Sequence, residues 1–324
     1  MSNKKIGIVF GEEFTRIISS DKGKIYDDFS LVCWNVLTTE IVLYGRDVKN
    51  TIGRLDDPLK VVNILDKYVI QNLEIFKHYA TILVERFKEE FDGAKIVISC
   101  PNSDNDFIQE FFKNLFNENT NFTSITFAPR IILSALGANA DIKDEYGVLI
   151  LDINQAYAKV ALIVEGKIIN EKETIYAEKF LDESLNQFIK EEYSISVDSD
   201  MIEKIKWSLG TIIKLRDELE LSIVGKDIIT NERRSVVCVS EEFKKIFIKS
   251  FTNYKSLITS VLENSSAIIR SGVVKNGLYV TGELAGISGV KDFFEDFFNF
   301  PVTISKKRGY SDIEGTLKLL NLKK

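Results

Sequence analysis

Residues 147–163 read GVLILDINQAYAKVALI. The apolar run that ends at Asp152 predicts a buried strand, the polar residues after it a turn, and residues 156–164 a second strand. The start of the chain has the same arrangement, with apolar residues 6–10, a polar turn, and apolar residues 15–19. A hairpin that recurs halfway along the chain predicts two duplicated domains of one architecture.

Strand and helix signals alternate after each hairpin, which favours an α/β fold. Further strands are expected at 29–34, 40–44, 95–99, 124–127, 167–175 and 278–281, with a strand-rich piece at 219–239. Helices are expected at 66–91, 104–116, 130–138, 178–192, 198–209, from about 240, and at 255–269 and 289–299. The predicted fold is therefore two duplicated α/β domains.

Composition excludes several classes of function. The 324 residues carry a net charge of −6, so a nucleic-acid partner is not expected. His78 is the only histidine and the three cysteines are far apart, which argues against a histidine metal site and a disulfide framework. No signal-like or membrane-spanning run is present, so we expect an intracellular protein. The basic run Lys306, Lys307 and Arg308 predicts a solvated face.

Several segments together resemble one family, the bacterial actin homologues of the MreB type. IGIVFGEEFT (6–15) and GVLILDINQAYAKVALI (147–163) resemble its two phosphate loops, and GLYVTGELAGISGV (277–290) its adenosine-binding turn. Five further segments resemble MreB in the same order along the chain: YGRDVKNTIGR with DPLKVVNILD, IVISCPN, FAPRIILSALGA, MIEKIKWSLG, and LSIVGKDIITNERRSVVCVSEEF. The resemblance therefore covers essentially the whole chain.

The resemblance implies an actin-like fold with four subdomains around a central nucleotide cleft. Domain I would span 1–142, with a smaller subdomain at 32–77 and the C-terminal segment 308–324 packed back onto it. Domain II would span 143–307, with a smaller subdomain at 179–239. The family role is a cytoplasmic cytoskeleton at the inner face of the cell membrane, which guides cell shape and cell-wall synthesis. Expected partners are further copies of the chain or MreB paralogues, wall-synthesis proteins and the membrane surface.

The first phosphate loop departs from the family pattern. Gly11 and Thr15 are kept as nucleotide-binding residues, but Val9 stands at the family's aspartate position and residues 12–14 are Glu, Glu and Phe. Each carboxylate about 5 Å from a phosphate costs about 3 kcal/mol, against about 8 kcal/mol for micromolar ATP binding. We therefore expect weak ATP binding or none.

The second loop keeps Asp152, which the resemblance makes a nucleotide and magnesium ligand. The glycines that follow it in the family are Asn, Gln and Ala at 154–156, which add bulk where backbone should approach phosphate. A purely structural hairpin is the alternative. Asp106 matches the family's water-positioning acid; it is equally explained as a charge at a helix N-terminus.

The residues expected to hold the nucleoside match the family better than those of the phosphate loops. Glu203 and Lys206 match the helix residues that hold ribose and base, and an ordinary surface ion pair is the alternative. Thr281, Gly282 and Glu283, followed by Leu284, replace the family's T-G-G-G.

Two functions remain open. The first is a cytoskeletal filament protein with weak or absent ATP hydrolysis, for which ATP and Mg are doubtful cofactors. The second is a pseudo-ATPase that does not polymerise and that regulates or scaffolds MreB filaments or wall-synthesis proteins. A working ATPase or small-molecule kinase is disfavoured by Val9 and the lost glycines.

Overall fold

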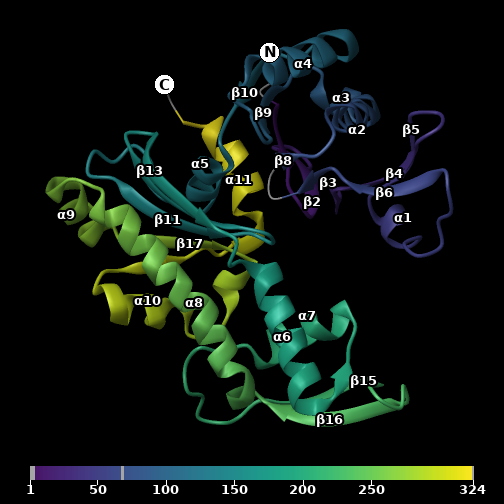
Figure 1. Cartoon of the computed structure of the whole chain (residues 1–324). Coiled ribbons are helices and arrows are strands. Elements are labelled where there is room, and N and C mark those ends of the chain that lie inside the picture. The colour runs from purple at the N-terminus through teal and green to yellow at the C-terminus, as the bar shows by residue number, and fades with distance from the viewer. Residues whose placement is uncertain (1–3, 67–68, 323–324) are drawn as a thin grey trace. The chain divides into compact units, whose positions relative to one another are not determined.

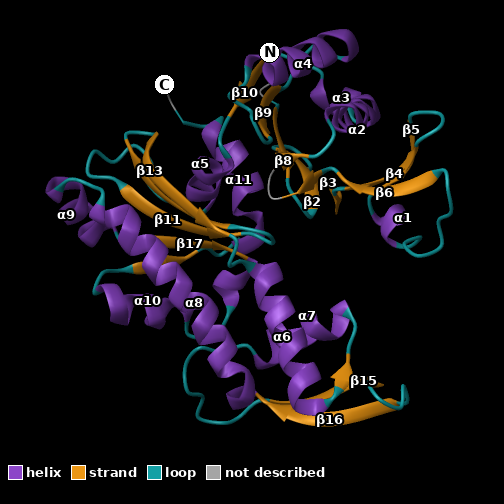
Figure 2. Ribbon diagram, viewed as in Figure 1, coloured by secondary structure: helices purple, strands orange, loops and turns teal. Residues whose placement is uncertain are grey.

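The computed structural model describes residues 4–66 and 69–322. The chain forms two compact units, unit 1 with residues up to 140 and from 310 onward, and unit 2 with residues 141–309 (Figure 1). Both contain strands flanked by helices (Figure 2). The parts of the predicted domain I at 1–3, 67–68 and 323–324 lie outside the described residues.

Unit 1 is built on a five-stranded sheet in the order β10-β9-β1-β2-β3. β2 runs antiparallel to β1 and β3, whereas β1, β9 and β10 run parallel to one another. The strands are β1 (Lys5–Phe10), β2 (Phe14–Ser19), β3 (Gly23–Phe29), β9 (Lys95–Ser99) and β10 (Ser124–Phe127). The predicted opening hairpin is confirmed, with Ile8 opposite Ile17.

The strand predicted at 29–34 is wrong in its limits. Phe29 ends β3, and β4 (Leu31–Asn35) begins after Ser30, in a separate small sheet. Ser30 is buried and its N–H donates to the carbonyl of Glu13, which turns the chain away from the first sheet. The small sheet is completed by β5 (Glu40–Tyr44) and β6 (Leu59–Asn63), with α1 (Arg46–Lys49) beside it.

The helix predicted at 66–91 begins later and is broken. The Asn72 side chain accepts hydrogen bonds from the N–H groups of Glu74 and Ile75, so the helix starts there. Helix α2 (Leu73–Arg86) is followed after Phe87 by α3 (Lys88–Phe91). The residues before it form β7 (Leu65–Asp66) and β8 (Val69–Ile70) instead.

The remaining helices of unit 1 are α4 (Asp106–Asn119), α5 (Arg130–Gly137) and α11 (Ser311–Leu319). A short 3₁₀ turn, η2 (Arg308–Tyr310), begins in the last residues of unit 2 and ends at the first residue of the returning segment of unit 1. On α4 the buried face includes Ile108 and Phe112, whereas Phe107 is 51% exposed. The C-terminal α11 packs against α5, and the Arg130 guanidinium lies 2.9 Å from the Asp312 carboxylate.

Unit 2 repeats the sheet of unit 1, in the order β13-β12-β11-β17-β18 with the same directions. The strands are β11 (Val148–Ile153), β12 (Ala158–Val164), β13 (Lys167–Thr174), β17 (Leu278–Gly282) and β18 (Val302–Ile304). All six residues of β11 are buried, which accounts for the apolar run that decided the fold. The predicted duplication of architecture is confirmed by this repeated topology.

Helices and a second small sheet complete unit 2. The helices are α6 (Glu178–Tyr193), α7 (Ser199–Leu209), α8 (Ser240–Glu263), α9 (Ala267–Asn276) and α10 (Val290–Phe298), with the 3₁₀ turn η1 (Glu283–Gly286). The small sheet contains β14 (Ile195–Ser196), β15 (Glu220–Asp227) and β16 (Arg233–Val239).

The helix predicted at 255–269 is wrong. Helix α8 continues from Ser240 through this region to Glu263, and α9 begins where the Ser266 side chain accepts the N–H of Ile269. Among the described residues of the chain, none of the helices is long and apolar enough to cross a bilayer.

Candidate functional site

The first loop of unit 1 closes on itself. The N–H of Gly11 donates to the carbonyl of Phe14 at 3.1 Å, and the Ser30 hydroxyl donates to the carbonyl of Gly11 at 2.6 Å. Thr15 is fully buried, with its hydroxyl 2.9 Å from that of Ser30. A Cβ at Gly11 would lie 2.6 Å from the carbonyl oxygen of Phe14, so the turn itself requires glycine. Both predicted ligands therefore have structural partners within the loop.

Asp106 is the first residue of α4 and is exposed. The neighbouring Asn105 caps the helix by accepting the N–H of Phe107 at 2.8 Å. A carboxylate at this position is favoured by the helix dipole. The observed position agrees with the helix-terminus explanation, and a catalytic role for Asp106 stays a prediction.

In unit 2, three predicted ligands meet at the ends of two parallel strands. Asp152 on β11 is opposite Thr281 on β17, and Ile153 is opposite Gly282. Asp152 is buried and accepts a hydrogen bond from the Asn154 amide at 3.3 Å. Gly282 has φ of 93°, and a Cβ there would lie 1.9 Å from the carbonyl oxygen of Ile153. Gly282 therefore allows β11 and β17 to approach each other closely, because a larger residue would clash with Ile153.

The second loop is bound to the start of α6. The N–H of Asn154 donates to the carbonyl of Tyr157 at 3.0 Å, which closes the turn. The N–H of Glu178 donates to the carbonyl of Asn154 at 3.3 Å, and that of Lys179 to the carbonyl of Gln155 at 2.7 Å. Free amides at a helix N-terminus are the groups that bind phosphate. Here the first amides of α6 bind the loop's own carbonyls.

The largest cluster of charges in unit 2 surrounds Lys206, whose side chain is only 1% exposed. Its ammonium lies 2.6 Å from Glu178, 3.0 Å from Asp182 and 2.6 Å from Glu203. Glu203 and Lys206 are thus together, as their spacing on α7 predicts. The sequence reasoning missed Glu178 and Asp182; their separation of four residues on one face of α6 is the signal that could have found them.

Burial governs the charges of this cluster. It raises the pKa of Glu178 from 4.5 to about 7, although the Lys206 ammonium opposes this shift. Burial also raises the pKa of Asp182. For Lys206 burial acts to lower the pKa, but the carboxylates outweigh it and raise the pKa above 10.5. The carboxylate oxygens of Glu178, Asp182 and Glu203 are close enough to hold a metal ion, but the ammonium already neutralises them in part.

The adenosine-type turn after β17 is covered by residues 305–309 of the same unit. The Thr281 hydroxyl donates to the carbonyl of Arg308 at 2.9 Å. A Cβ at Gly309 would lie 2.0 Å from the Glu283 carboxylate, and a Cβ at Gly286 would lie 2.2 Å from the Arg308 guanidinium. Lys306, Lys307 and Arg308 are all exposed, as predicted, and the Arg308 guanidinium lies close to the Gly286 backbone.

These contacts test whether magnesium and ATP fit the chain. Phosphate requires backbone amides that point to the ligand, whereas the amides of Gly11, Glu178 and Lys179 have internal carbonyl partners. The ammonium of Lys206 is surrounded by carboxylates within its unit. The groups expected to bind the phosphates therefore fit ATP poorly. Glu203, with its side chain 54% exposed, is the better candidate for a ribose contact.

Comparison with solved structures gives the same fold over the full chain. The structure of MreB5 of Spiroplasma citri bound to AMPPNP superimposes with a TM-score of 0.82 at 24% identity, covering 98% of this chain and 96% of that one. A MamK double helical filament matches with a TM-score of 0.73 at 15% identity, over the whole of both chains. The fold is actin-like.

Curated relatives span the same length. The cell shape-determining protein Mbl of Bacillus cereus is 22% identical over 318 residues, covering 98% of this chain and 95% of that protein. Mbl of Bacillus subtilis is 22% identical over 310 residues, covering 94% and 92%. The model of the family described as MreB/Mbl protein matches residues 3–324. The chain belongs to the MreB/Mbl family.

Proposed function

We propose that this protein is a subunit of a bacterial cytoskeletal filament that acts in cell shape or cell-wall synthesis, with weak or absent ATP hydrolysis. Family membership over the whole chain supports the cytoskeletal part, because the curated relatives are named cell shape-determining proteins. The MamK structure is a double helical filament, which supports self-assembly. Subunits would join head to tail in the cytoplasm.

The proposal of weak ATP hydrolysis rests on one observation: the groups expected to bind nucleotide are already paired with other groups of the chain. Lys206, the Gly11 turn and the first amides of α6 have partners within their own units. Homologous MreB5 structures hold AMPPNP and ADP, so nucleotide binding remains part of the proposal. The proposed contacts are Gly11, Thr15, Asp152, Glu203, Lys206, Thr281, Gly282 and Glu283, with magnesium on Asp152.

The family resemblance extends the proposal to partners and subdomains. MreB paralogues, wall-synthesis enzymes and the inner membrane surface are the proposed partners, reached by peripheral attachment. The smaller subdomains at 32–77 and 179–239 contain the two small sheets, β5-β4-β6 and β14-β15-β16. The strands of these small sheets do not pair with the five-stranded sheets, which supports the four-subdomain division.

Negative-stain electron microscopy of the purified chain, with and without Mg-ATP, tests the filament. Filaments in both conditions are expected. The second candidate, a pseudo-ATPase that does not polymerise, is favoured by the altered first loop with Glu12 and Glu13. It predicts no filaments alone but co-sedimentation with an intact MreB, whereas the filament proposal predicts pelleting without that partner.

A further inference from the structure

Trp207 is a large aromatic residue at the surface of unit 2. It lies near the end of α7 and is 38% exposed, and among the described residues it does not belong to the main apolar core of the unit. The only other tryptophan, Trp34, is buried. Burial therefore explains the position of Trp207 only in part. Its ring N–H, which can donate but not accept, supplies a second reason.

The indole N–H of Trp207 donates to the Glu203 carboxylate, one turn away on the same face of α7. It contacts Oε1, whereas the Lys206 ammonium lies 2.6 Å from Oε2. Each oxygen of this carboxylate therefore has its own donor. Two donors restrict the rotamers of Glu203, although its side chain is 54% exposed. The carboxylate is thus oriented before a ligand binds.

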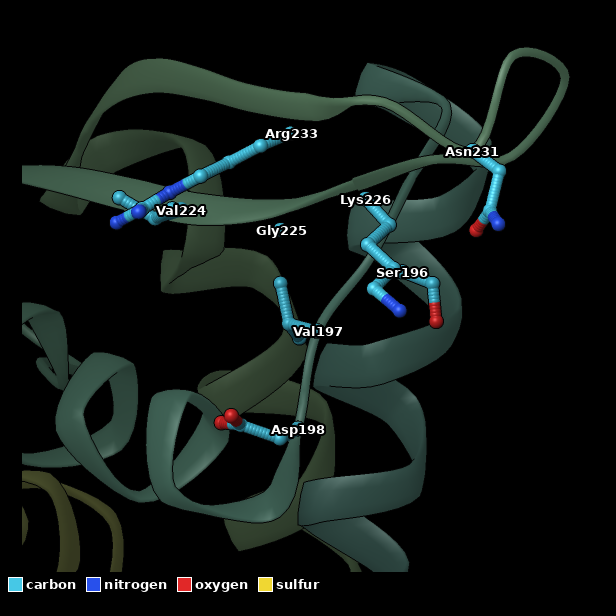
Figure 3. Close-up of a pocket in the computed structure, with 8 residues that line it drawn as sticks. All are labelled: Ser196, Val197, Asp198, Val224, Gly225, Lys226, Asn231 and Arg233. Atoms are coloured by element: carbon cyan, nitrogen blue, oxygen red, sulfur yellow. The ribbon is translucent and has the colours of Figure 1, made fainter.

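The groups that orient Glu203 are themselves held. Asp198, one of the residues that line the hollow in Figure 3, accepts the N–H of Met201 at 2.8 Å and so fixes the start of α7. The Lys206 ammonium is anchored to α6 by the Glu178 carboxylate at 2.6 Å. The position of the Glu203 carboxylate is therefore defined by the packing of α6 and α7.

The free side of the Glu203 carboxylate suits a particular ligand group. An ionised carboxylate offers about four lone-pair sites, of which Lys206 and Trp207 use two. The exposure of the side chain leaves the other sites open to solvent. Two neighbouring hydroxyl groups supply two donors for these sites, whereas a phosphate would be repelled by the negative charge. The arrangement therefore fits the vicinal diol of a ribose.

We propose that Trp207 is a positioning residue for sugar recognition. Its N–H holds the Glu203 carboxylate in the orientation that accepts hydrogen bonds from both ribose hydroxyls, so nucleotides with an intact diol bind better than nucleotides without it. A site built to bond a hydroxyl rejects the analogue that lacks it. The inference rests on the proposed function, in which Glu203 contacts the nucleotide, and adds to that site a sugar selectivity and the residue that maintains it.

Binding of ADP and of 2′,3′-dideoxy-ADP, followed by ligand-observed NMR, tests this selectivity. Loss of the diol should weaken binding to the native chain at least about tenfold, as expected for hydrogen bonds to a charged group. Trp207→Phe retains an aromatic ring but removes the N–H. It should reduce the preference to about twofold or less by weakening ADP binding, with the affinity for 2′,3′-dideoxy-ADP changed by less than about twofold.

Trp207→Gln tests whether the donor is what matters. On α6 the Gln187 amide donates to Glu191, so a glutamine can bond a glutamate four residues away in this chain. This variant should recover the preference to within about threefold of the native value. Lys204→Gln, at an exposed position of the same helix, is the control and should leave both dissociation constants unchanged. Circular dichroism verifies that each variant is folded.

The outcomes separate the inference from the proposed function. A preference that survives in Trp207→Phe, or equal weakening of both ligands, overturns the inference and leaves nucleotide binding in place. Failure of Trp207→Gln to recover the preference also overturns it, because the ring and not the donor would then be needed. Equal binding of both ligands by the native chain refutes the diol contact alone. If the native chain binds neither ligand, the inference and the proposed nucleotide contacts fail together, and the filament stands or falls by sedimentation.

Discussion

At the scale of single residues, Lys206 shows why a nucleotide is not needed to balance the charges of this chain. Its ammonium is within 3.0 Å of three carboxylates, so the charge that would face a ligand is already used inside unit 2. A buried charge with all its partners present is tolerated, whereas removal of one member leaves the others uncompensated. The cluster therefore holds α6 against α7 without a bound molecule.

Lys206→Met should destabilise unit 2 by about 3 kcal/mol, because the buried Glu178 carboxylate then faces Asp182 and Glu203 without a cation. Urea unfolding followed by tryptophan fluorescence measures this, since Trp207 is adjacent on α7. The matched control is Lys204→Met on the exposed face of the same helix, which should change stability by about 0.5 kcal/mol or less. Equal losses of unfolding free energy for the two substitutions would show that the charge cluster does not stabilise the fold.

Glu178 gives the cluster a pH dependence. Because burial raises its pKa from 4.5 to about 7, the folded chain binds a proton in this range that the unfolded chain releases. The free energy of unfolding should therefore fall as pH rises from about 4.5 to about 7, by at most about 1.4 kcal/mol per pH unit. The raised pKa of Asp182 acts in the same direction.

Glu178→Gln should flatten this dependence, which urea unfolding at a series of pH values measures. Glu183→Gln, at another acid of α6 with no comparable burial, is the control and should retain the slope. An unchanged slope in the Glu178 variant, or stability that rises with pH in this range, contradicts the assignment.

Sequence reasoning identified residues better than it identified their roles. The pairing of Glu203 with Lys206 follows from helical spacing. Asp152 and Thr281 came from the family resemblance, and the structure places them opposite each other on parallel strands. The roles of Glu178 and Ser30 depend on contacts between segments 28 and 15 residues apart, which local patterns do not encode.

At the scale of elements, the two glycine-containing turns are fixed by packing of the chain against itself. Gly11 accommodates the carbonyl of Phe14, and Gly282 accommodates that of Ile153. Gly11 matches a phosphate loop of the family and Gly282 its adenosine-binding turn, yet packing within each unit requires both glycines before any ligand is considered. The strands at 40–44, 95–99 and 124–127 were predicted with their observed limits, because each is a short, clearly bounded run. Errors fell where a capping side chain begins a helix that the apolar pattern did not mark, as Asn72 does for α2 and Ser266 for α9.

Gly282→Ala tests this reading of the turn. A Cβ 1.9 Å from the Ile153 carbonyl, at φ of 93°, should cost about 3 kcal/mol through clash and backbone strain. Gly166→Ala is the control, since Gly166 has φ of 79° but nothing within 4 Å, and should cost about 1 kcal/mol. Chemical unfolding of both variants measures the difference. Similar losses of stability in the two variants would indicate that backbone strain alone sets the cost and that the Ile153 carbonyl adds no clash.

At the scale of the whole molecule, the duplicated sheets give the chain an actin-like fold, while its loops argue against efficient ATP use. Family membership follows from the match over residues 3–324, and the repeated strand order is found in both units. The overall architecture was predictable because conserved order along the chain survives low identity. Whether the chain binds ATP was not predictable, because this depends on which hydrogen bonds the loop residues make within the chain.

Calorimetric titration with Mg-ATP should give a Kd weaker than about 100 µM, since one carboxylate near phosphate removes about 3 kcal/mol from a micromolar interaction. Replacing both acids of the first loop, with Glu12→Ser and Glu13→Ser, should tighten binding at least about tenfold. Glu40→Ser with Glu74→Ser, at exposed positions of unit 1, is the control. Low-micromolar binding by the native chain would contradict the loop argument.

The central claim is that this chain assembles without depending on nucleotide hydrolysis. High-speed sedimentation of the native protein over a concentration series, without nucleotide and with Mg-ATP or Mg-ADP, tests it most directly. We predict pelleting above a critical concentration that differs by less than about threefold among the three conditions, which corresponds to about 0.6 kcal/mol. Pelleting that occurs only with Mg-ATP, or no pelleting in any condition, would contradict the account.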